Sequence, residues 1–160
     1  MNISQNGIDV LKYFERCSLY AYPDPGSENG EPWTIGWGET GPDVMEGTVW
    51  TQVQCDARLI QRVATTAHNV TFRVTIPVTQ GQFDAMVCLA YNIGDTAFGD
   101  STLLKLVNAG RPTDASLQFA KWNHNDGKVM RGLARRRKAE ECLFNGMNAA
   151  DAILVGVKAA

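Results

Sequence analysis

The sequence lacks a long apolar run. No segment approaches the roughly 20 apolar residues that a helix needs to cross a bilayer. The N-terminus, MNISQNGIDVLKYFERC, has no basic stretch followed by an apolar one, the pattern of a secretory signal. These absences predict a chain that does not insert stably into membranes and that accumulates in the cytoplasm of the cell that makes it.

Metal-binding patterns are also missing. The chain has two histidines and four cysteines but no CxxC pair, so the spacing of zinc sites is absent. We expect no metal site and no cofactor. Thiols stay reduced in cytosol and pack like small hydrophobes, so we expect free, mostly buried thiols at Cys17, Cys55, Cys88 and Cys142.

What the chain does contain is helical periodicity, interrupted once. Residues 22–41 hold five of the 15 glycines and three of the six prolines, which predicts turns around short strands. The best strand is PWTIGWG, with Trp33, Ile35 and Trp37 on one face. Elsewhere the apolar spacing predicts helices over residues 4–17, 51–68, 79–94, 101–108, 113–122 and 131–144.

Several helix ends carry their own signals. TQVQ from Thr51 and TQGQ from Thr79 match the capping box, in which a threonine is followed three residues later by glutamine. Gly146 is a typical stop for the last helix. The helix from Thr51 is expected to carry Val53 and Ile60 on its apolar side, with Ala64 and Ala67.

This order of elements predicts an α+β, mainly helical fold. We expect a single domain over residues 1–160. It would comprise a first helix with a small β lobe at about 1–50, a connecting helix at about 51–68 and a helical lobe at about 69–160.

Glu15 is a charge close to an apolar helix face. On a helical wheel of residues 8–17 it projects between Leu11 and Ile8, at the rim of that face. Desolvation disfavours the charged form of a carboxyl group, so such a side chain keeps its proton more readily, as a general acid must. The structural alternative is a helix-edge glutamate paired with an arginine.

A second carboxylate follows in a wetter setting. Asp24 heads a Pro/Gly turn, and Thr34 lies at the start of TIGWG. When one acid lies in an apolar setting and the other in a polar setting, the pKa values of the two carboxyl groups move apart. One group can then act as the acid and the other as the base. Pairs of this kind cleave glycosidic bonds.

Glu15, Asp24 and Thr34 in this order resemble the catalytic triad of phage-type lysozymes, glycoside hydrolase family 24. AYNIGDTAFGDSTLLKLVNAG and KVMRGLARRRKAEECLF are similar to two further segments of that family, and the resemblance covers about residues 7–145. It implies a lysozyme-like two-lobe fold, with a small N-terminal β-hairpin region and a helical C-terminal lobe.

The resemblance also implies the chemistry. Glu15 is the general acid at the β-1,4 bond that follows N-acetylmuramic acid in bacterial peptidoglycan. Asp24 polarises the attacking water or supports the positive sugar centre, and Thr34 holds that water. Inversion at the sugar requires carboxyl groups about 6.5–9.5 Å apart.

The loop between Asp24 and Thr34 departs from the family pattern. It is longer than usual and carries two more acids, Glu28 and Glu31. Because loop-closure cost grows slowly with length, we expect Asp24 to keep its place while the turn grows. The alternative is a shifted register with Glu28 or Glu31 as the second carboxylate.

Three further residues are candidate substrate contacts, and two of them, Tyr91 and Ser101, fall at positions where the family has a cleft-facing aromatic residue and a substrate-contacting serine. Tyr91 is expected either to stack on a sugar or to pack in the core with its hydroxyl satisfied. Ser101 is a substrate contact, a helix N-cap, or both. Gly38 ends the strand and offers backbone groups to an N-acetyl moiety.

Three tryptophans carry structural alternatives. Trp122 resembles a core residue of the helical lobe. Trp33 and Trp37 either line the site or close the small core of the β lobe.

A basic cluster stands out in a chain whose net charge is −2. Its default interpretation is a solvated helix face, and the alternative is attraction to the anionic bacterial envelope. No recognition helix or aromatic platform accompanies it, so no nucleic-acid partner is expected. The cluster consists of Lys128, Arg131, Arg135, Arg136, Arg137 and Lys138.

The functional expectation is a monomeric endolysin that cuts peptidoglycan. It would stay in the host cytoplasm until a holin lesion releases it to the periplasm and cell wall. Two alternatives stay open: a lytic transglycosylase, which needs only the acid, and a catalytically silent peptidoglycan-binding relative.

Overall fold

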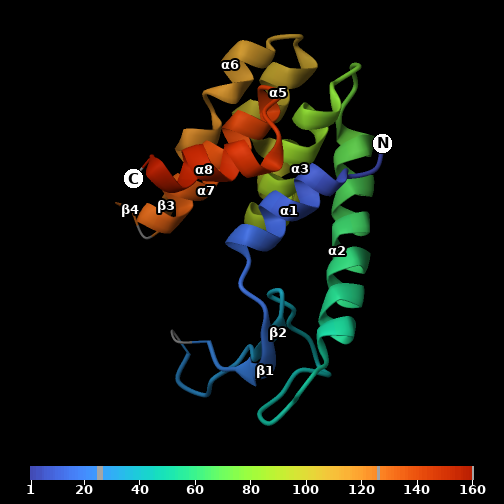
Figure 1. Ribbon diagram of the computed structural model, residues 1–160, viewed down its shortest axis with the longest axis vertical. Helices are drawn as coiled ribbons and strands as arrows, with labels where there is room; N and C mark the ends of the chain where they lie inside the picture. The colour runs from blue at the N-terminus through green and yellow to red at the C-terminus, as the bar shows by residue number, and fades with distance from the viewer. Residues whose placement is uncertain (25–26, 126, 160) are drawn as a thin grey trace. The chain divides into compact units, whose positions relative to one another are not determined.

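The computed structural model describes residues 1–24, 27–125 and 127–159. It divides into a small unit, residues 12–63, and a helical unit, residues 1–11 and 64–160. Within the described residues, no helix is long and apolar enough to cross a membrane. Figure 1 labels most of the elements. They are α1 (Gln5–Phe14), β1 (Ser18–Tyr22), β2 (Thr34–Gly36), α2 (Gln52–Arg73), α3 (Gln80–Ile93), α4 (Asp95–Asp100), α5 (Thr102–Asn108), α6 (Pro112–Ser116), η1 (Phe119–Trp122), β3 (His124–Asn125), β4 (Lys128–Val129), α7 (Arg131–Phe144) and α8 (Ala149–Lys158).

The small unit is built around one antiparallel pair. β1 pairs with β2 so that Ser18 faces Gly36 and Tyr22 faces Thr34, with a bulge between the two positions. Ile35 is fully buried in this pair. The strand in PWTIGWG is shorter than predicted, because the backbone at Gly36 turns to φ +64°, a conformation that glycine adopts without strain.

The helical unit is organised on α3. Nine consecutive residues of α3, from Phe83 to Tyr91, are buried, as expected for a helix surrounded by others. α7 packs on α3 and on α8 (Figure 1). The N-terminal part of α1 also approaches α3 closely, because the Cys88 thiol donates to the Gly7 carbonyl oxygen at 3.4 Å.

Both capping boxes predicted from the sequence are confirmed. At Thr51 the backbone N–H donates to the Gln54 side chain at 2.8 Å, and the Thr51 hydroxyl accepts from the Gln54 N–H at 3.2 Å. Thr79 and Gln82 make the same reciprocal pair. Each box satisfies two backbone donors that a helix start leaves free.

Other helix predictions need correction. α1 ends at Phe14 rather than at residue 17, and α2 continues five residues beyond 68, to Arg73. The predicted apolar side of α2 is confirmed only at Ala67, since Val53 is 79% exposed, Ile60 is 63% exposed and Ala64 is exposed. The buried stripe consists of Cys55, Leu59, Val63, Ala67 and Val70.

Some elements had no counterpart in the sequence analysis. Residues 113–122 separate into α6 and η1, while α4, α8 and the β3–β4 hairpin were not predicted. Their shortness explains most of these omissions, because two to six residues give no readable period. The mainly helical class with small antiparallel pairs is confirmed.

Candidate functional site

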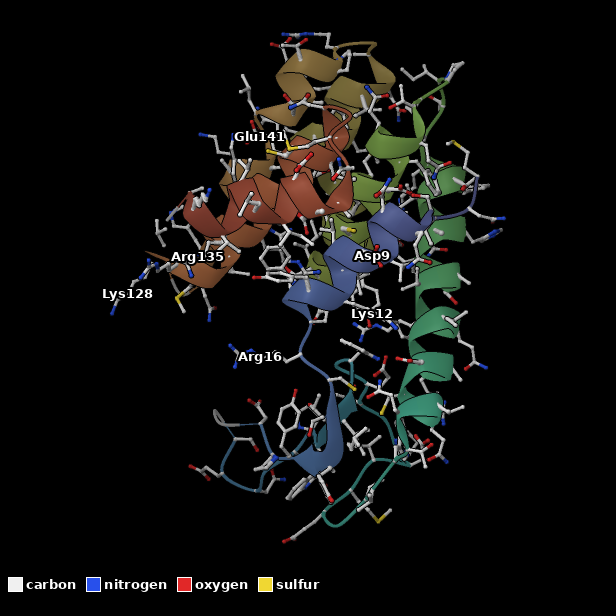
Figure 2. The ribbon with its side chains drawn as sticks, in the orientation of Figure 1. Asp9, Lys12, Arg16, Lys128, Arg135 and Glu141 are labelled. Carbon is white, nitrogen blue, oxygen red and sulfur yellow. The ribbon has the colours of Figure 1, made fainter. Side chains whose placement is uncertain are left out.

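Glu15 is the first residue after α1. It lies on the connector between α1 and β1, and its side chain is half-buried. Figure 2 shows its neighbour Arg16 on the same connector, where the side chain is exposed. The carboxylate therefore projects from a helix end rather than from the apolar face of a continuing helix.

Gly38 forms one wall of the space around Glu15. A Cβ built on Gly38 would lie 3.8 Å from Glu15 Oε2 and 3.8 Å from Arg62 Nη1. Arg62 Nη1 also donates to the Gly38 carbonyl oxygen at 2.8 Å. α2 thus brings a guanidinium group to the same glycine that the Glu15 carboxylate approaches.

Thr34 and Tyr22 are opposite each other across the strand pair. Burial raises the pKa of the Tyr22 hydroxyl, and the negative charges of Glu15 and Glu39 raise it further. The phenol therefore lies within the electrostatic reach of both carboxylates. The strand register brings Thr34 opposite Tyr22, and the charge of Glu15 acts on the Tyr22 hydroxyl within the same small unit.

Asp24 follows β1 by two residues and is half-buried. Its backbone N–H donates to the Gly30 carbonyl oxygen at 3.0 Å, and its own carbonyl accepts from the Ser27 N–H at 3.1 Å. Pro25 and Gly26 lie outside the described residues. Glu28 and Glu31, the alternative second carboxylates, are exposed, and the register keeps Asp24 just beyond the Tyr22–Thr34 pair.

Glu39, the residue that follows Gly38, is a buried carboxylate. It is 9% exposed, and its Oε2 accepts from the Trp37 backbone N–H at 2.8 Å. Its own backbone closes the turn with Ile35 through two hydrogen bonds of 2.9 Å. The sequence offered one signal for Glu39, an acidic residue close behind the strand and next to Gly38.

Asp56 was missed entirely, and it anchors the Trp37 side chain. Its Oδ1 accepts from Trp37 Nε1 at 2.8 Å, from Gln52 at 3.0 Å and from Lys12 at 3.2 Å. The Trp37 hydrogen bond, above all, holds the pKa of Asp56 below its usual range. Lys12 Nζ also lies 5.1 Å from the centre of the Trp37 ring, a cation–π contact.

The other two expected substrate contacts, Tyr91 and Ser101, lie in the helical unit. Tyr91 is 5% exposed, near the C-terminal end of α3. Ser101 is 4% exposed and caps α5: its hydroxyl accepts from the Leu104 N–H at 3.1 Å and donates to the Phe98 carbonyl oxygen at 2.6 Å. The capping role predicted for Ser101 is confirmed.

The basic cluster is not uniformly a solvated face. Arg136 and Arg137 are buried and flank the fully buried Glu140, with N–O distances of 3.0 Å and 2.9 Å. Arg137 also donates to the Asn92 side chain. Lys128 projects outward from the β3–β4 hairpin, and Figure 2 shows it on that element.

Tryptophan and cysteine environments complete the description. Trp33, Trp37 and Trp122 are half-buried. All four cysteines are free thiols: Cys55, Cys88 and Cys142 are buried and Cys17 is half-buried. Among the described residues, no group of three or more His, Cys, Asp or Glu is arranged to hold a metal ion.

Comparison with known proteins identifies relatives along most of the chain. Residues 12–140 match the family model for phage lysozyme. An endolysin of Bacillus phage PZA is 42% identical over 91% of this chain and 55% of its own length. The chain spans about half the length of this relative and of the Bacillus phage B103 endolysin. An endolysin of Acyrthosiphon pisum secondary endosymbiont phage 1 is 38% identical over 90% of this chain and 98% of its own length.

Solved structures agree. The endolysin from Escherichia coli O157:H7 phage FAHEc1 superposes with a TM-score of 0.81 at 35% identity, covering 91% of this chain and 94% of that one. The muramidase domain of SpmX from Asticaccaulis excentricus superposes with a TM-score of 0.80 at 36% identity, covering 89% of this chain and 97% of that one. The fold is lysozyme-like, and the chain belongs to the phage lysozyme family.

Proposed function

We propose that this protein is an endolysin that hydrolyses the β-1,4 bond between N-acetylmuramic acid and N-acetylglucosamine in bacterial peptidoglycan. The observation that carries the proposal is the half-buried Glu15 carboxylate beside Gly38, in the same unit as the paired Tyr22 and Thr34. The names of its relatives, endolysin and muramidase domain, support this activity.

In this mechanism the three proposed catalytic residues have separate tasks. Glu15 donates a proton to the leaving glycosidic oxygen. Asp24 polarises the attacking water, and the Thr34 hydroxyl orients that water on the opposite face of the sugar. The reaction needs room for the water between the carboxyl groups, so it predicts a separation of about 6.5–9.5 Å and inversion at the anomeric carbon.

Substrate binding is assigned to three further residues. Gly38 offers backbone groups beside Glu15, where a side chain would fill the space. Tyr91 presents an aromatic edge for a sugar ring, and Ser101 presents a hydroxyl oxygen. These roles follow the family pattern, and the burial of Tyr91 and Ser101 limits each to a narrow contact surface.

The biological setting follows from the activity. The protein accumulates in the host cytoplasm as a monomer and reaches the cell wall after a holin opens the membrane. Peptidoglycan is its partner, and no nucleic acid or cofactor takes part. A lytic transglycosylase and a catalytically silent wall-binding relative are the competing functions.

Replacing Glu15 with glutamine tests the proposal, because the amide keeps the shape and loses the transferable proton. We expect Glu15→Gln to lower the rate of wall lysis at least 100-fold, a typical share of general acid catalysis, while wall binding persists. Glu28→Gln is the matched control on an exposed glutamate and should retain full activity.

Mass spectrometry of the released muropeptides separates the competing functions. Reducing muramic acid ends support hydrolysis, and anhydro-muramyl ends would make the protein a transglycosylase. Unchanged lysis by Glu15→Gln would remove Glu15 from the mechanism. A wild-type protein that binds walls without releasing sugars would be a silent relative.

A further inference from the structure

Two of the four thiols of this protein are neighbours. Cys17 is the last residue of the connector between α1 and β1, and Cys55 lies in the first turn of α2. The Cys17 thiol lies close enough to Cys55 to contribute to the raised pKa of the Cys55 thiol. Both residues belong to the small unit, so a contact within one compact body brings them together.

The strand pair independently places these thiols side by side. Cys17 directly precedes Ser18, which faces Gly36 across the β1–β2 ladder. A Cβ built on Gly36 would lie 3.5 Å from the Cys55 sulfur. The Gln52 amide, one turn before Cys55, contacts the Cys17 sulfur at 3.7 Å. The strand pair and the first turn of α2 therefore bring the two thiols into the same region of the small unit.

The two thiols differ in exposure, and this difference decides which of them reacts first. Cys17 is half-buried and open to a small reagent, whereas Cys55 is fully buried. Burial, followed by the interaction with Cys17, raises the pKa of the Cys55 thiol to about 11. Because the thiolate is the attacking species, Cys17 is the thiol that reacts first.

We propose that Cys17 and Cys55 are a disulfide-forming pair, free in reducing conditions and cross-linked when the protein meets a small-molecule disulfide oxidant. Joining them requires only that the Cys17 connector, which belongs to no helix or strand, moves its sulfur into bonding distance. The pair itself does not depend on the proposed endolysin function. That function supplies the change of compartment, from cytoplasm to cell wall.

The chemistry balances with oxidised glutathione as the oxidant. The Cys17 thiolate attacks one sulfur of glutathione disulfide, forms a mixed disulfide and releases one glutathione thiolate, which takes up a proton. Cys55 then loses its proton and attacks the Cys17 sulfur of the mixed disulfide, releasing the second glutathione. Two protein thiols are oxidised to one disulfide, and one glutathione disulfide is reduced to two thiols.

The bond would restrain the segment that carries Glu15. Cys17 follows Glu15 by two residues, so the cross-link ties the connector to the first turn of α2. Since Cys17 and Cys55 belong to the same compact unit, we expect the cross-linked protein to keep its activity and to resist heat better. Closing a loop of this length typically gives a Tm increase of roughly 5–10 °C for a chain of this size.

Peptide mapping of the full-length chain tests the proposal. The protein is incubated with oxidised or reduced glutathione, treated with iodoacetamide, and digested without reduction. Trypsin cleaves after Arg16 and Arg58, so both thiols fall in one peptide, residues 17–58, while Cys88 and Cys142 fall in separate peptides. The oxidised sample should yield this peptide unalkylated and about 2 Da lighter than the same peptide with two free thiols. Further cleavage after its glutamates should leave two fragments joined by the disulfide.

Matched variants make the result specific. Cys17→Ser and Cys55→Ala should each abolish the linked fragments and the Tm increase, while Cys142→Ser should leave both unchanged. A stable glutathione adduct on Cys17 without the internal bond would overturn the proposal, as would a peptide 17–58 that is alkylated at both cysteines after oxidation. Glu15→Gln separates this proposal from the proposed function. The variant should lose wall lysis but still form the Cys17–Cys55 cross-link.

Discussion

At the scale of single residues, the site depends on side chains that hold the backbone around Glu15 rather than on Glu15 alone. Glu39 fixes the Trp37 backbone, Asp56 fixes the Trp37 ring, and Arg62 fixes the Gly38 carbonyl. These contacts leave Glu15 facing a wall that is already rigid, which favours preorganised chemistry over rearrangement on binding.

Arg62 and Arg58 provide a matched test of this wall. Arg62→Ala removes the 2.8 Å hydrogen bond to Gly38 and should lower kcat for wall lysis about threefold to tenfold. Arg58, one turn away, pairs instead with the exposed Asp43 at 2.6 Å, so Arg58→Ala should change kcat by less than about twofold. Equal losses of kcat in both variants would show that the hydrogen bond from Arg62 to Gly38 makes no specific contribution to activity.

The lowered pKa of Asp56 predicts a pH-dependent contribution to stability. A carboxyl group whose folded pKa is depressed stabilises the protein above its unfolded pKa, near 3.9, and loses that contribution as pH falls through the folded value. Asp56→Asn should therefore lower Tm at pH 7 by a few degrees, and the difference from wild type should shrink as pH falls below about 4. Thermal unfolding at pH 7 and pH 3 measures this, with the exposed Asp9→Asn as control (Figure 2). A difference independent of pH would contradict the electrostatic cause.

At the scale of elements, close helix packing is set by glycine in the C-terminal helices. A Cβ on Gly156 of α8 would lie 2.6 Å from the Arg135 carbonyl oxygen and 2.8 Å from the Ala139 Cβ, both on α7. Neither neighbour can rotate away, so the two helices are in contact because residue 156 has no side chain.

Gly156→Ala should therefore lower the free energy of unfolding by about 1–3 kcal/mol, the usual cost of overpacking. Gly132, on α7, is the matched control, since a Cβ there would meet nothing within 4 Å. Gly132→Ala should be neutral or stabilising by up to about 1 kcal/mol. Urea denaturation measures both, and a destabilised Gly132→Ala would shift the cause from packing to backbone geometry.

The sequence predicted elements well where local signals decide them. The bounds of α7 and the caps at Thr51 and Thr79 follow from residues within one turn of each helix end. The buried side of α2 did not follow, because the helix carries two apolar stripes and only tertiary packing selects between them. The burial of Arg136 and Arg137 was hidden for the same reason, since a basic run predicts exposure until its buried partner, Glu140, is known.

The candidate site divides in the same way. Glu15, Asp24 and Thr34 were predicted because their order resembles a family pattern, although the loop between Asp24 and Thr34 is longer than in that pattern. Asp56 and Arg62 were not, since both act from α2, far along the chain from the residues they hold. Contacts of long sequence separation leave no periodic trace in a single sequence.

At the scale of the whole molecule, the two units differ in the size of their apolar cores. The small unit buries only a few large apolar side chains, Ile35 and Leu59 among them, whereas α3 alone contributes nine consecutive buried residues to the helical unit. Local stability follows the density of buried apolar contacts, so the two units should open at different free energies.

Native-state hydrogen exchange in low urea measures this difference. We expect the amides of β1 and β2 to exchange through openings whose free energy is at least about 2 kcal/mol lower than that of the openings that expose α3. Exchange of both sets at one common free energy would instead show that the chain opens as a single cooperative body.

A hydroxyl group carries one proton, and Ser101 has already committed its own to the Phe98 carbonyl oxygen, while Leu104 occupies one of its lone pairs. The Ser101 oxygen therefore has one lone pair left to accept a hydrogen bond from a ligand. A sugar that touches Ser101 must therefore approach with an O–H or N–H group foremost, and an N-acetyl carbonyl oxygen in that place would meet only repulsion.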